Sequence, residues 1–186
     1  MVPLGMAQSS AALIGNSIGA NNVGLAKRFF YLILKIVVPL TAIMASIPIF
    51  ACRQIVGIFT TDDELAALAT PLMIIAGCNF FADGIQGILA GPIRALSLQK
   101  TAGYIALGCY WLVGIPTAGV LAFKYDMSVN GLYLGLIAAT ALQALLYLAI
   151  LLFTDWQEIA DNVAKRISKE EEKAAEEKSV EDSDSY

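Results

Sequence analysis

Five runs of apolar residues, each long enough to cross a lipid bilayer, constrain the fold of this chain more than any other feature. A transmembrane helix needs roughly 20 mostly apolar residues, with a range of about 17–25. Continuous apolar runs of this length predict helices that lie in lipid. The runs cover residues 2–19, 26–51, 66–90, 101–123 and 129–153. We therefore expect an all-α membrane protein, a polytopic bundle of about five transmembrane helices.

The overall composition supports the same expectation. Of the 186 residues, 58% are hydrophobic, and the mean hydropathy is +0.68. A typical soluble domain is only about 45–50% apolar, and a soluble core of this chain length could not bury so much apolar surface. The lipid bilayer is therefore the expected surroundings of an integral multi-pass protein.

The first run is the most polar of the five, and several runs repeat small residues. Gln8 and Asn16 are the larger polar side chains of the first run, so its helix is expected to line a water-filled cavity or to lie at the bundle centre. Small residues at a spacing of four predict faces where helices pack closely. These positions are Ala11, Gly15 and Gly19, then Gly87 and Gly91, and then Gly131 and Gly135.

Charged residues predict the orientation of the chain in the membrane. Residues 1–153 carry seven Lys/Arg and five Asp/Glu, whereas residues 154–186 carry five and eleven. Lysine and arginine gather in cytoplasmic connections. Here they gather in the first and third connections and in the tail, at Lys27, Arg28, Arg94, Lys100, Lys165 and Arg166. We expect these segments and the C-terminus to be cytoplasmic, and a five-helix chain in this orientation predicts that further helices precede it.

The last 33 residues differ from the membrane part in composition. Residues 154–168 are expected to form a short cytoplasmic amphipathic helix that begins at a Thr154-Asp155 cap, with Trp156 at the membrane interface. Residues 169–186 are rich in Glu, Lys and Ser, which predicts an acidic disordered tail.

Asp83 is the most informative single residue, because it is the only acidic residue well inside an apolar run. A charged carboxylate near the bilayer centre costs about 2.5–3.5 kcal/mol on insertion scales, so such residues commonly serve a function. Asn79 and Gln86 lie four residues before and three residues after Asp83, which puts the three on one helical face. The alternative is a structural Asp83 that only holds helices together.

Other kinds of site have little support in the sequence. The chain contains no histidine, which excludes histidine-based triads, metal ligands and proton relays. Cys52, Cys78 and Cys109 are far apart, and their spacing predicts neither a disulfide framework nor a metal site. Nothing beyond Asp83 suggests catalysis, so we expect no enzyme, no catalytic residues, no cofactor and no metal, and no nucleic-acid partner.

Seven short motifs are spread along the chain. They are Val2-Pro3-Leu4-Gly5, Ile14-Gly15-Asn16-Ser17-Ile18-Gly19-Ala20-Asn21-Asn22, Ile58-Phe59-Thr60-Thr61-Asp62, Ala82-Asp83-Gly84-Ile85-Gln86-Gly87, Gly114-Ile115-Pro116, Gly131-Leu132-Tyr133 and Thr154-Asp155-Trp156. Together they closely resemble the motifs of the MATE family, the multidrug and toxic compound extrusion transporters, in its eukaryotic type. The resemblance covers nearly the whole chain apart from the acidic tail.

The resemblance implies a fold and an activity. MATE transporters have twelve helices in two lobes, and this chain resembles the eighth to twelfth helices, a partial C-terminal lobe. The implied activity is antiport at a plasma or vacuolar/vesicular membrane: a small organic cation or drug-like substrate leaves as protons or sodium ions enter. Asp83 occupies the position of the acidic residue on the family's tenth helix, which implies a role in cation or proton coupling. Asn79, Gln86, Gln8 and Asn16 are then candidate residues of the substrate cavity.

The sequence also departs from the family. The N-terminal lobe is absent, and so is the acidic residue of the seventh helix, which implies a partner lobe. Arg94-Ala95-Leu96-Ser97-Leu98-Gln99 lacks the usual glycines, and Ala106 stands where asparagine is expected. Two hypotheses follow: a secondary-transport module that is incomplete on its own, or a non-transporting membrane scaffold or assembly partner.

Overall fold

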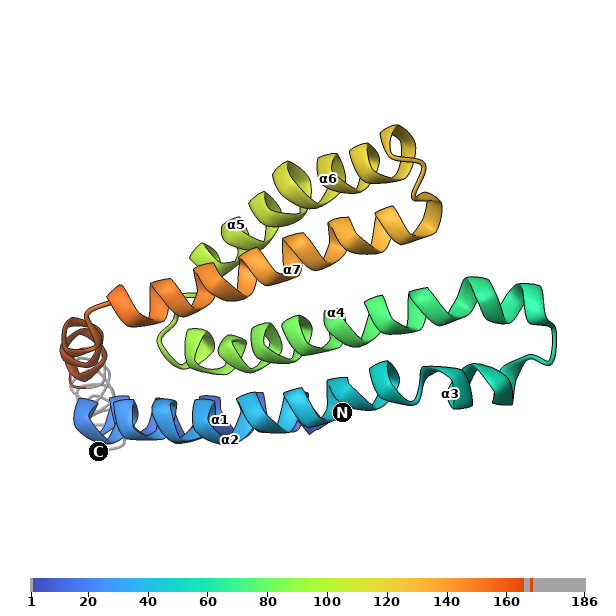
Figure 1. The fold of residues 1–186 in the computed structure, drawn as a ribbon. Helices are drawn as coiled ribbons and strands as arrows, with labels where there is room; N and C mark the ends of the chain where they lie inside the picture. The colour runs from blue at the N-terminus through green and yellow to red at the C-terminus, as the bar shows by residue number, and fades with distance from the viewer. Residues whose placement is uncertain (1, 166–167, 169–186) are drawn as a thin grey trace, which may run out of the picture.

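The computed structural model describes residues 2–165 and 168, and it is helical almost throughout this part of the chain (Figure 1). The acidic tail expected over residues 169–186 lies outside the described residues. The helices are α1 (Val2–Gly19), α2 (Val23–Phe50), α3 (Cys52–Phe59), α4 (Asp63–Ala95), α5 (Gln99–Gly108), α6 (Ile115–Gly119) and α7 (Ser128–Phe153), with π-helical segments η1 (Cys109–Gly114) and η2 (Val120–Lys124).

The five predicted runs all form helices, but they are not equally suited to a membrane. Four helical stretches of the described chain are long and apolar enough to cross a bilayer: α2, α4, the continuous stretch Gln99–Lys124 and α7. Helix α1 has 18 residues, but it is not one of these four, because polar side chains such as Gln8 and Asn16 dilute its apolar surface. All five predicted spans are therefore long enough to cross a bilayer, but only four of them are also apolar enough.

Helix α4 is the centre of the bundle. It packs against α1, α2 and α7, and α7 in turn packs against the stretch from α5 to η2. Helices α1 and α7 make no contact with each other within the described chain. Figure 1 shows that α1 and α4 run in the same direction and that α2 runs back between their ends. Helices α2 and α7 also make no contact with each other in the described chain, so the side of α4 between α2 and α7 and the side between α1 and α7 are both left as gaps.

Glycines at a spacing of seven let two helices approach α4 closely. A Cβ at Gly77 would lie 2.6 Å from Ile49 Cγ1, and one at Gly84 would lie 2.7 Å from Thr41 Cγ2. A Cβ at Gly91 would overlap the Ser10 hydroxyl and the Ala7 carbonyl of α1. The three glycines thus form a seam of close backbone contact along α4. Such contact stabilises helix packing in lipid, where the hydrophobic effect does not drive helices together.

The structure confirms part of the small-residue prediction and corrects the rest. A Cβ at Gly131 would lie 2.6 Å from the Ala122 nitrogen, and one at Gly135 would lie 2.5 Å from the Ala118 nitrogen, so α7 does pack closely there. The predicted packing at Gly15, Gly19 and Gly87 is wrong for this chain, since a Cβ at each would meet nothing within 4 Å. Helix α1 buries Ala7, Ser10, Ile14, Ser17 and Ile18 instead.

Polar residues cap the beginnings of α2 and α4. Asn21 has a φ of 53°, a left-handed conformation that asparagine tolerates, and the Asn22 side chain caps α2 by accepting a hydrogen bond from the Leu25 nitrogen at 3.1 Å. The Asp62 side chain caps α4 through the Glu64 nitrogen at 2.9 Å.

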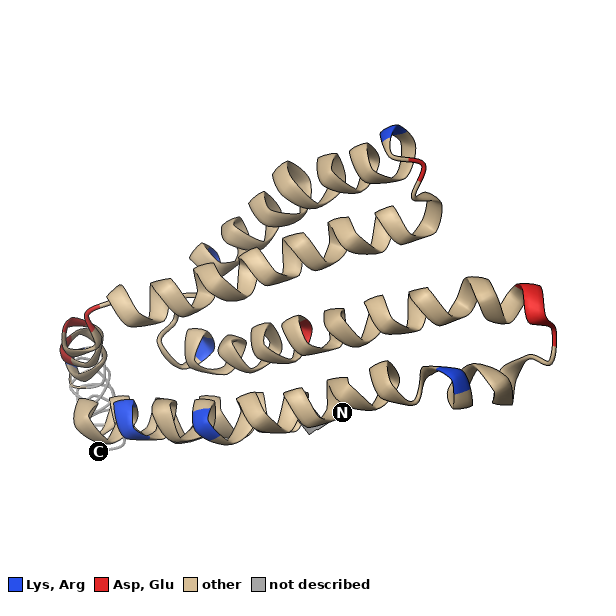
Figure 2. Cartoon of the chain, in the orientation of Figure 1, with Lys and Arg blue, Asp and Glu red and all other residues tan. Residues whose placement is uncertain are grey.

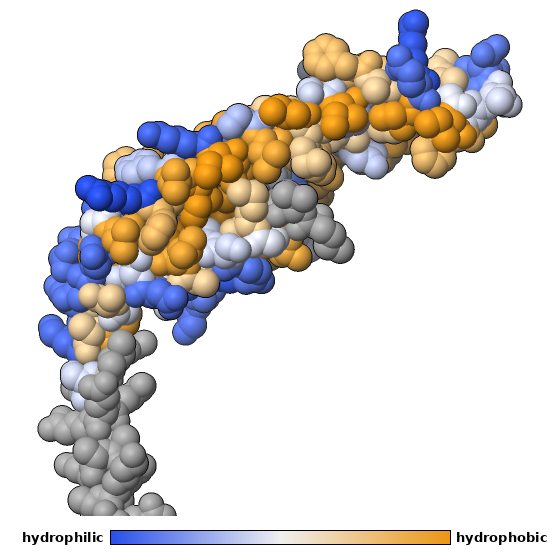
Figure 3. Space-filling model, turned by 90° about the horizontal axis from the view of Figure 1, so that it is seen from below, coloured by the Kyte–Doolittle hydropathy of each residue, from blue (hydrophilic) through white to orange (hydrophobic). Residues whose placement is uncertain are grey.

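The two ends of the bundle differ in charge. Figure 2 shows basic residues where α2 begins and where α4 ends, and acidic residues where α4 begins. Figure 3 shows the hydrophobic colour along the length of the bundle and the hydrophilic colour toward its two ends. The connections with excess lysine and arginine therefore share one end of the molecule, as the prediction of orientation requires.

Trp156 is the clearest correction outside the apolar runs. It begins a helix over residues 156–165, but its side chain is only 2% exposed, so it lies in the core rather than at the membrane interface. Its Nε1 donates a hydrogen bond to the Leu151 carbonyl at 2.8 Å, and its ring centroid is 5.6 Å from that of Phe30. Ile159 and Val163 pack against the same core. This short helix is thereby fixed to the bundle.

Candidate functional site

Asp83 lies at membrane depth with its side chain exposed. It follows Asp63 by twenty residues and precedes Arg94 by eleven, which puts it roughly 30 Å and 16 Å from them along the axis of α4. Figure 2 shows the acidic colour inside α4, nearer its C-terminal end than its start, in the segment that holds Asp83. The side chain is exposed on the surface of the bundle rather than clamped between its helices. The carboxylate is therefore open on this face, inside a helix that is long and apolar enough to cross a membrane.

The direction in which Asp83 faces follows from the residues around it. An apolar cavity of about 420 Å³ occupies the gap between α2 and α7, and Phe81 and Ile85 line it from α4. Each helical residue turns by about 100°, so Asp83 lies roughly half a turn away from both. The glycine seam at Gly84 and Gly91 faces α2 and α1. Asp83 therefore faces the remaining gap, the one between α1 and α7.

The structure brings Asn79 and Gln86 together with Asp83. Both are half-buried on the same stripe of α4, whereas Phe80 and Asp83 on that stripe are exposed. The Asn79 Oδ1 is buried and has no hydrogen-bond partner among the described residues. A buried acceptor without a donor costs roughly 1–3 kcal/mol, so this oxygen retains a capacity to accept a hydrogen bond that the described residues do not use.

The polar residues of α1 are farther away. The contact of Gly91 with Ser10 sets the register of α4 and α1, which run in the same direction (Figure 1). Asn16 is then level with Ser97, roughly 20 Å along the axis from Asp83, and Gln8 is roughly 9 Å away. Both side chains are exposed. The structure therefore does not bring Asn16 to the site around Asp83, and Gln8 lies at its margin.

Sequence reasoning missed a buried polar group on α7. Gln143 is 2% exposed, and its Nε2 donates a hydrogen bond to the Tyr147 hydroxyl at 2.8 Å. That hydroxyl donates in turn to the Ala102 carbonyl of α5 at 3.1 Å. Because the single hydroxyl proton is used on Ala102, the Gln143 amide must donate, and its Oε1 remains without a partner among the described residues. The signal was present, since Gln143 interrupts an apolar run as Asp83 does.

No group of three His, Cys, Asp or Glu side chains in the described part of the chain could hold a metal ion. Cys52, Cys78 and Cys109 are free cysteines, and Cys52 and Cys109 are buried. The chemistry at this site therefore belongs to one carboxylate and its amide neighbours.

These features define a polytopic helical membrane protein with a carboxylate at membrane depth. Comparison with known families identifies it further: the family model described as MatE matches residues 1–120, and the chain belongs to this family. The resemblance to the MATE family that the sequence suggested is thereby confirmed.

Relatives and a solved structure extend the match beyond residue 120. The chain is 30% identical over 173 residues to Protein DETOXIFICATION 17 of Arabidopsis thaliana, covering 92% of this chain and 36% of that protein. It is 32% identical over 168 residues to Protein DETOXIFICATION 16 of the same plant, covering 90% and 34%. The crystal structure of the eukaryotic MATE transporter AtDTX14 matches with a TM-score of 0.81 and 26% identity, covering 89% of this chain and 37% of that one. The chain thus spans about a third of the length of the curated relatives it matches.

Proposed function

We propose that this chain is the partial C-terminal lobe of a secondary transporter that exports organic cations and related xenobiotics in exchange for protons or sodium ions. Membership in the MatE family supports the transporter class. The observation that carries the proposal is the exposed Asp83 carboxylate, which lies at membrane depth on the face of α4 that its own helices leave open.

The energetic cost of a carboxylate in lipid supports a polar environment for the Asp83 side chain. A carboxylate facing hydrocarbon costs about 2.5–3.5 kcal/mol, and such groups face a water-filled cavity or a partner instead. The gap between α1 and α7 provides such a face. A scaffold function predicts a carboxylate that clamps helices of this bundle, and an exposed Asp83 does not do so.

The proposed mechanism is competition for one carboxylate. Asp83 binds either the cationic group of the substrate or the proton or sodium ion, and this exclusion couples the two movements. Asn79 and Gln86 supply neutral hydrogen-bonding groups beside it, and the buried Asn79 Oδ1 accepts from a protonated amine or from water. Gln8 contributes only at the margin. Coupling uses the ion gradient alone, with no bound cofactor and no catalytic step.

The proposed transporter needs a second lobe. Alternating access moves one lobe against the other around a site near the membrane midplane. The chain spans about a third of its relatives, so we propose an N-terminal lobe as its partner. The lysine and arginine distribution supports a cytoplasmic C-terminus in a plasma or vacuolar/vesicular membrane.

Transport in vesicles tests the proposal. The chain is expressed alone and together with the N-terminal lobe of a relative, and efflux of a fluorescent organic cation is followed under an imposed pH or sodium gradient. We expect gradient-driven efflux only with both lobes, and its loss in Asp83→Asn. Asp126→Asn, an exposed acid outside the spans, is the matched control and should transport like the parent. Normal efflux by an assembled Asp83→Asn variant would refute the coupling role.

A further inference from the structure

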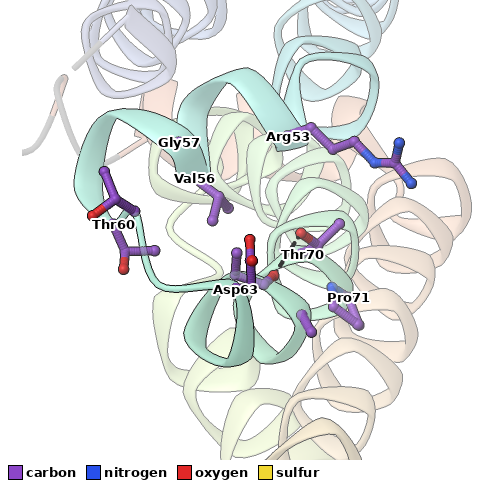
Figure 4. Close-up of a pocket in the computed structure, with 10 residues that line it drawn as sticks. Arg53, Val56, Gly57, Thr60, Asp63, Thr70 and Pro71 are labelled. Atoms are coloured by element: carbon purple, nitrogen blue, oxygen red, sulfur yellow. Dashed lines mark hydrogen bonds between the residues drawn. The ribbon is translucent and has the colours of Figure 1, made fainter.

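A second cavity lies at the opposite end of the bundle from the helix over residues 156–165. It has a volume of about 520 Å³ and lies between α3 and the first turns of α4 (Figure 4). Val56 and Pro71 give it apolar walls, and Arg53, Thr60 and Asp63 give it polar ones. The proposed transport site does not use any of these residues.

The cavity carries one charge of each sign. Arg53 and Asp63 are both exposed, and Figure 4 shows the Arg53 guanidinium at the edge of the cavity, turned away from the Asp63 carboxylate. Thr60 already accepts a hydrogen bond from the Asp62 nitrogen at 3.1 Å, and Thr70 donates to the Ala66 carbonyl at 2.8 Å. The two exposed charges line the same cavity without facing each other, an arrangement that suits a ligand carrying both signs.

The position of the cavity matches the headgroup level of a membrane. Helix α2 has 28 residues, and at about 1.5 Å per residue it exceeds the hydrocarbon thickness of about 30 Å. Helix α3 follows it and so lies where the hydrocarbon ends. Phe50 at the end of α2 and Ile58 and Phe59 at the end of α3 are 83%, 80% and 83% exposed. Such side chains are suited to contact with acyl chains.

We propose that this cavity binds the headgroup of a zwitterionic phospholipid such as phosphatidylethanolamine. The Arg53 guanidinium holds the phosphate, since its planar fork matches phosphate oxygens. The Asp63 carboxylate binds the ammonium group, and the acyl chains lie along Phe50 and Phe59. A purely anionic headgroup fits less well, because the Asp63 carboxylate in the cavity wall repels it.

Lipid titration of the detergent-solubilised full chain tests this site, with binding followed by native mass spectrometry. The two lipids are palmitoyl-oleoyl phosphatidylethanolamine and the corresponding phosphatidylglycerol, which lacks the ammonium group. We expect Arg53→Gln to weaken the binding of both lipids, and Asp63→Asn to weaken that of phosphatidylethanolamine alone. Each loss should be about fivefold, as for a partly exposed charged contact.

Two control variants each remove a nearby charge, one of the same sign as Asp63 and one of the same sign as Arg53. Glu64→Gln changes the acid next to Asp63 that does not line the cavity, and Lys124→Gln changes the basic residue of the other connection at this end. Both should bind either lipid like the parent. Asp62, the residue that caps α4, is intact in all variants, so the helix start is preserved. Equal losses for Glu64→Gln and Asp63→Asn, or unchanged phosphatidylethanolamine binding in Arg53→Gln, would overturn the proposal.

Discussion

A matched pair of alanine substitutions on α4 tests the packing of the bundle. In Gly91→Ala the new Cβ overlaps the Ser10 hydroxyl and the Ala7 carbonyl, so α1 must move away from α4. In Gly87→Ala, about one turn earlier on the same helix, the new Cβ meets nothing within 4 Å. The two variants therefore carry the same glycine-to-alanine change and differ only in the space available to the new Cβ.

The magnitude follows from two opposing terms. Alanine in place of glycine favours a helix by about 1 kcal/mol, and this gain applies to both positions. Overpacking costs typically about 1–3 kcal/mol, and this cost applies only to Gly91→Ala because a rigid carbonyl is in the way. We expect Gly87→Ala to be stabilised by up to about 1 kcal/mol and to exceed Gly91→Ala in stability by about 1–3 kcal/mol.

Thermal unfolding of the full chain in detergent measures this difference. For a chain of this size 1 kcal/mol corresponds to a shift in Tm of roughly 2–4 °C. Gly91→Ala should therefore melt several degrees below Gly87→Ala, and circular dichroism at the helix band can follow both. Equal melting temperatures, or a more stable Gly91→Ala, would refute the close contact between α1 and α4.

Three further variants test other contacts. Trp156→Ala should lower the free energy of unfolding by about 3–5 kcal/mol, because the indole is 2% exposed. It should also expose the helix over residues 156–165 to limited proteolysis. Trp111→Ala, at an exposed position, should leave both properties unchanged. Tyr147→Phe should cost about 1–3 kcal/mol in thermal unfolding, since it leaves Gln143 and the Ala102 carbonyl without their partner. The double variant Tyr147→Phe with Gln143→Leu should recover most of that loss, and an additive loss would contradict the shared network. Asn22→Ala should cost about 0.5–2 kcal/mol through the lost cap of α2, and an unchanged melting temperature would show that the cap contributes nothing.

The sequence predicted the helices because their signals are local. Run length and capping residues such as Asn22 and Asp62 act within a few positions of one another. The shared face of Asn79, Asp83 and Gln86 also follows from helical spacing alone. What the spacing could not give is the direction of that face, since this depends on where α1 and α7 pack.

The corrections all involve contacts between distant segments. Trp156 fits an interfacial position and a core position equally well by its amphipathic ring, and only its contact with Phe30 decides between them. The Tyr147 hydroxyl reaches a carbonyl 45 residues away, which no local pattern reveals. Gly91 contacts α1 and Gly87 does not, because helix crossing selects which glycines meet a neighbour.

The central claim is that Asp83 faces water at membrane depth, and cysteine labelling tests it most directly. Cys52, Cys78 and Cys109 are replaced by alanine, and Asp83→Cys is compared with Ile43→Cys in the assembled chain. Ile43 is 63% exposed on α2, and the contact of Thr41 with Gly84 puts it close to the depth of Asp83. We predict that a membrane-impermeant maleimide reacts with Asp83→Cys at least tenfold faster, about the ratio that a free-energy difference of 1.4 kcal/mol gives. Equal labelling at the two positions would mean that Asp83 faces lipid, which contradicts the account.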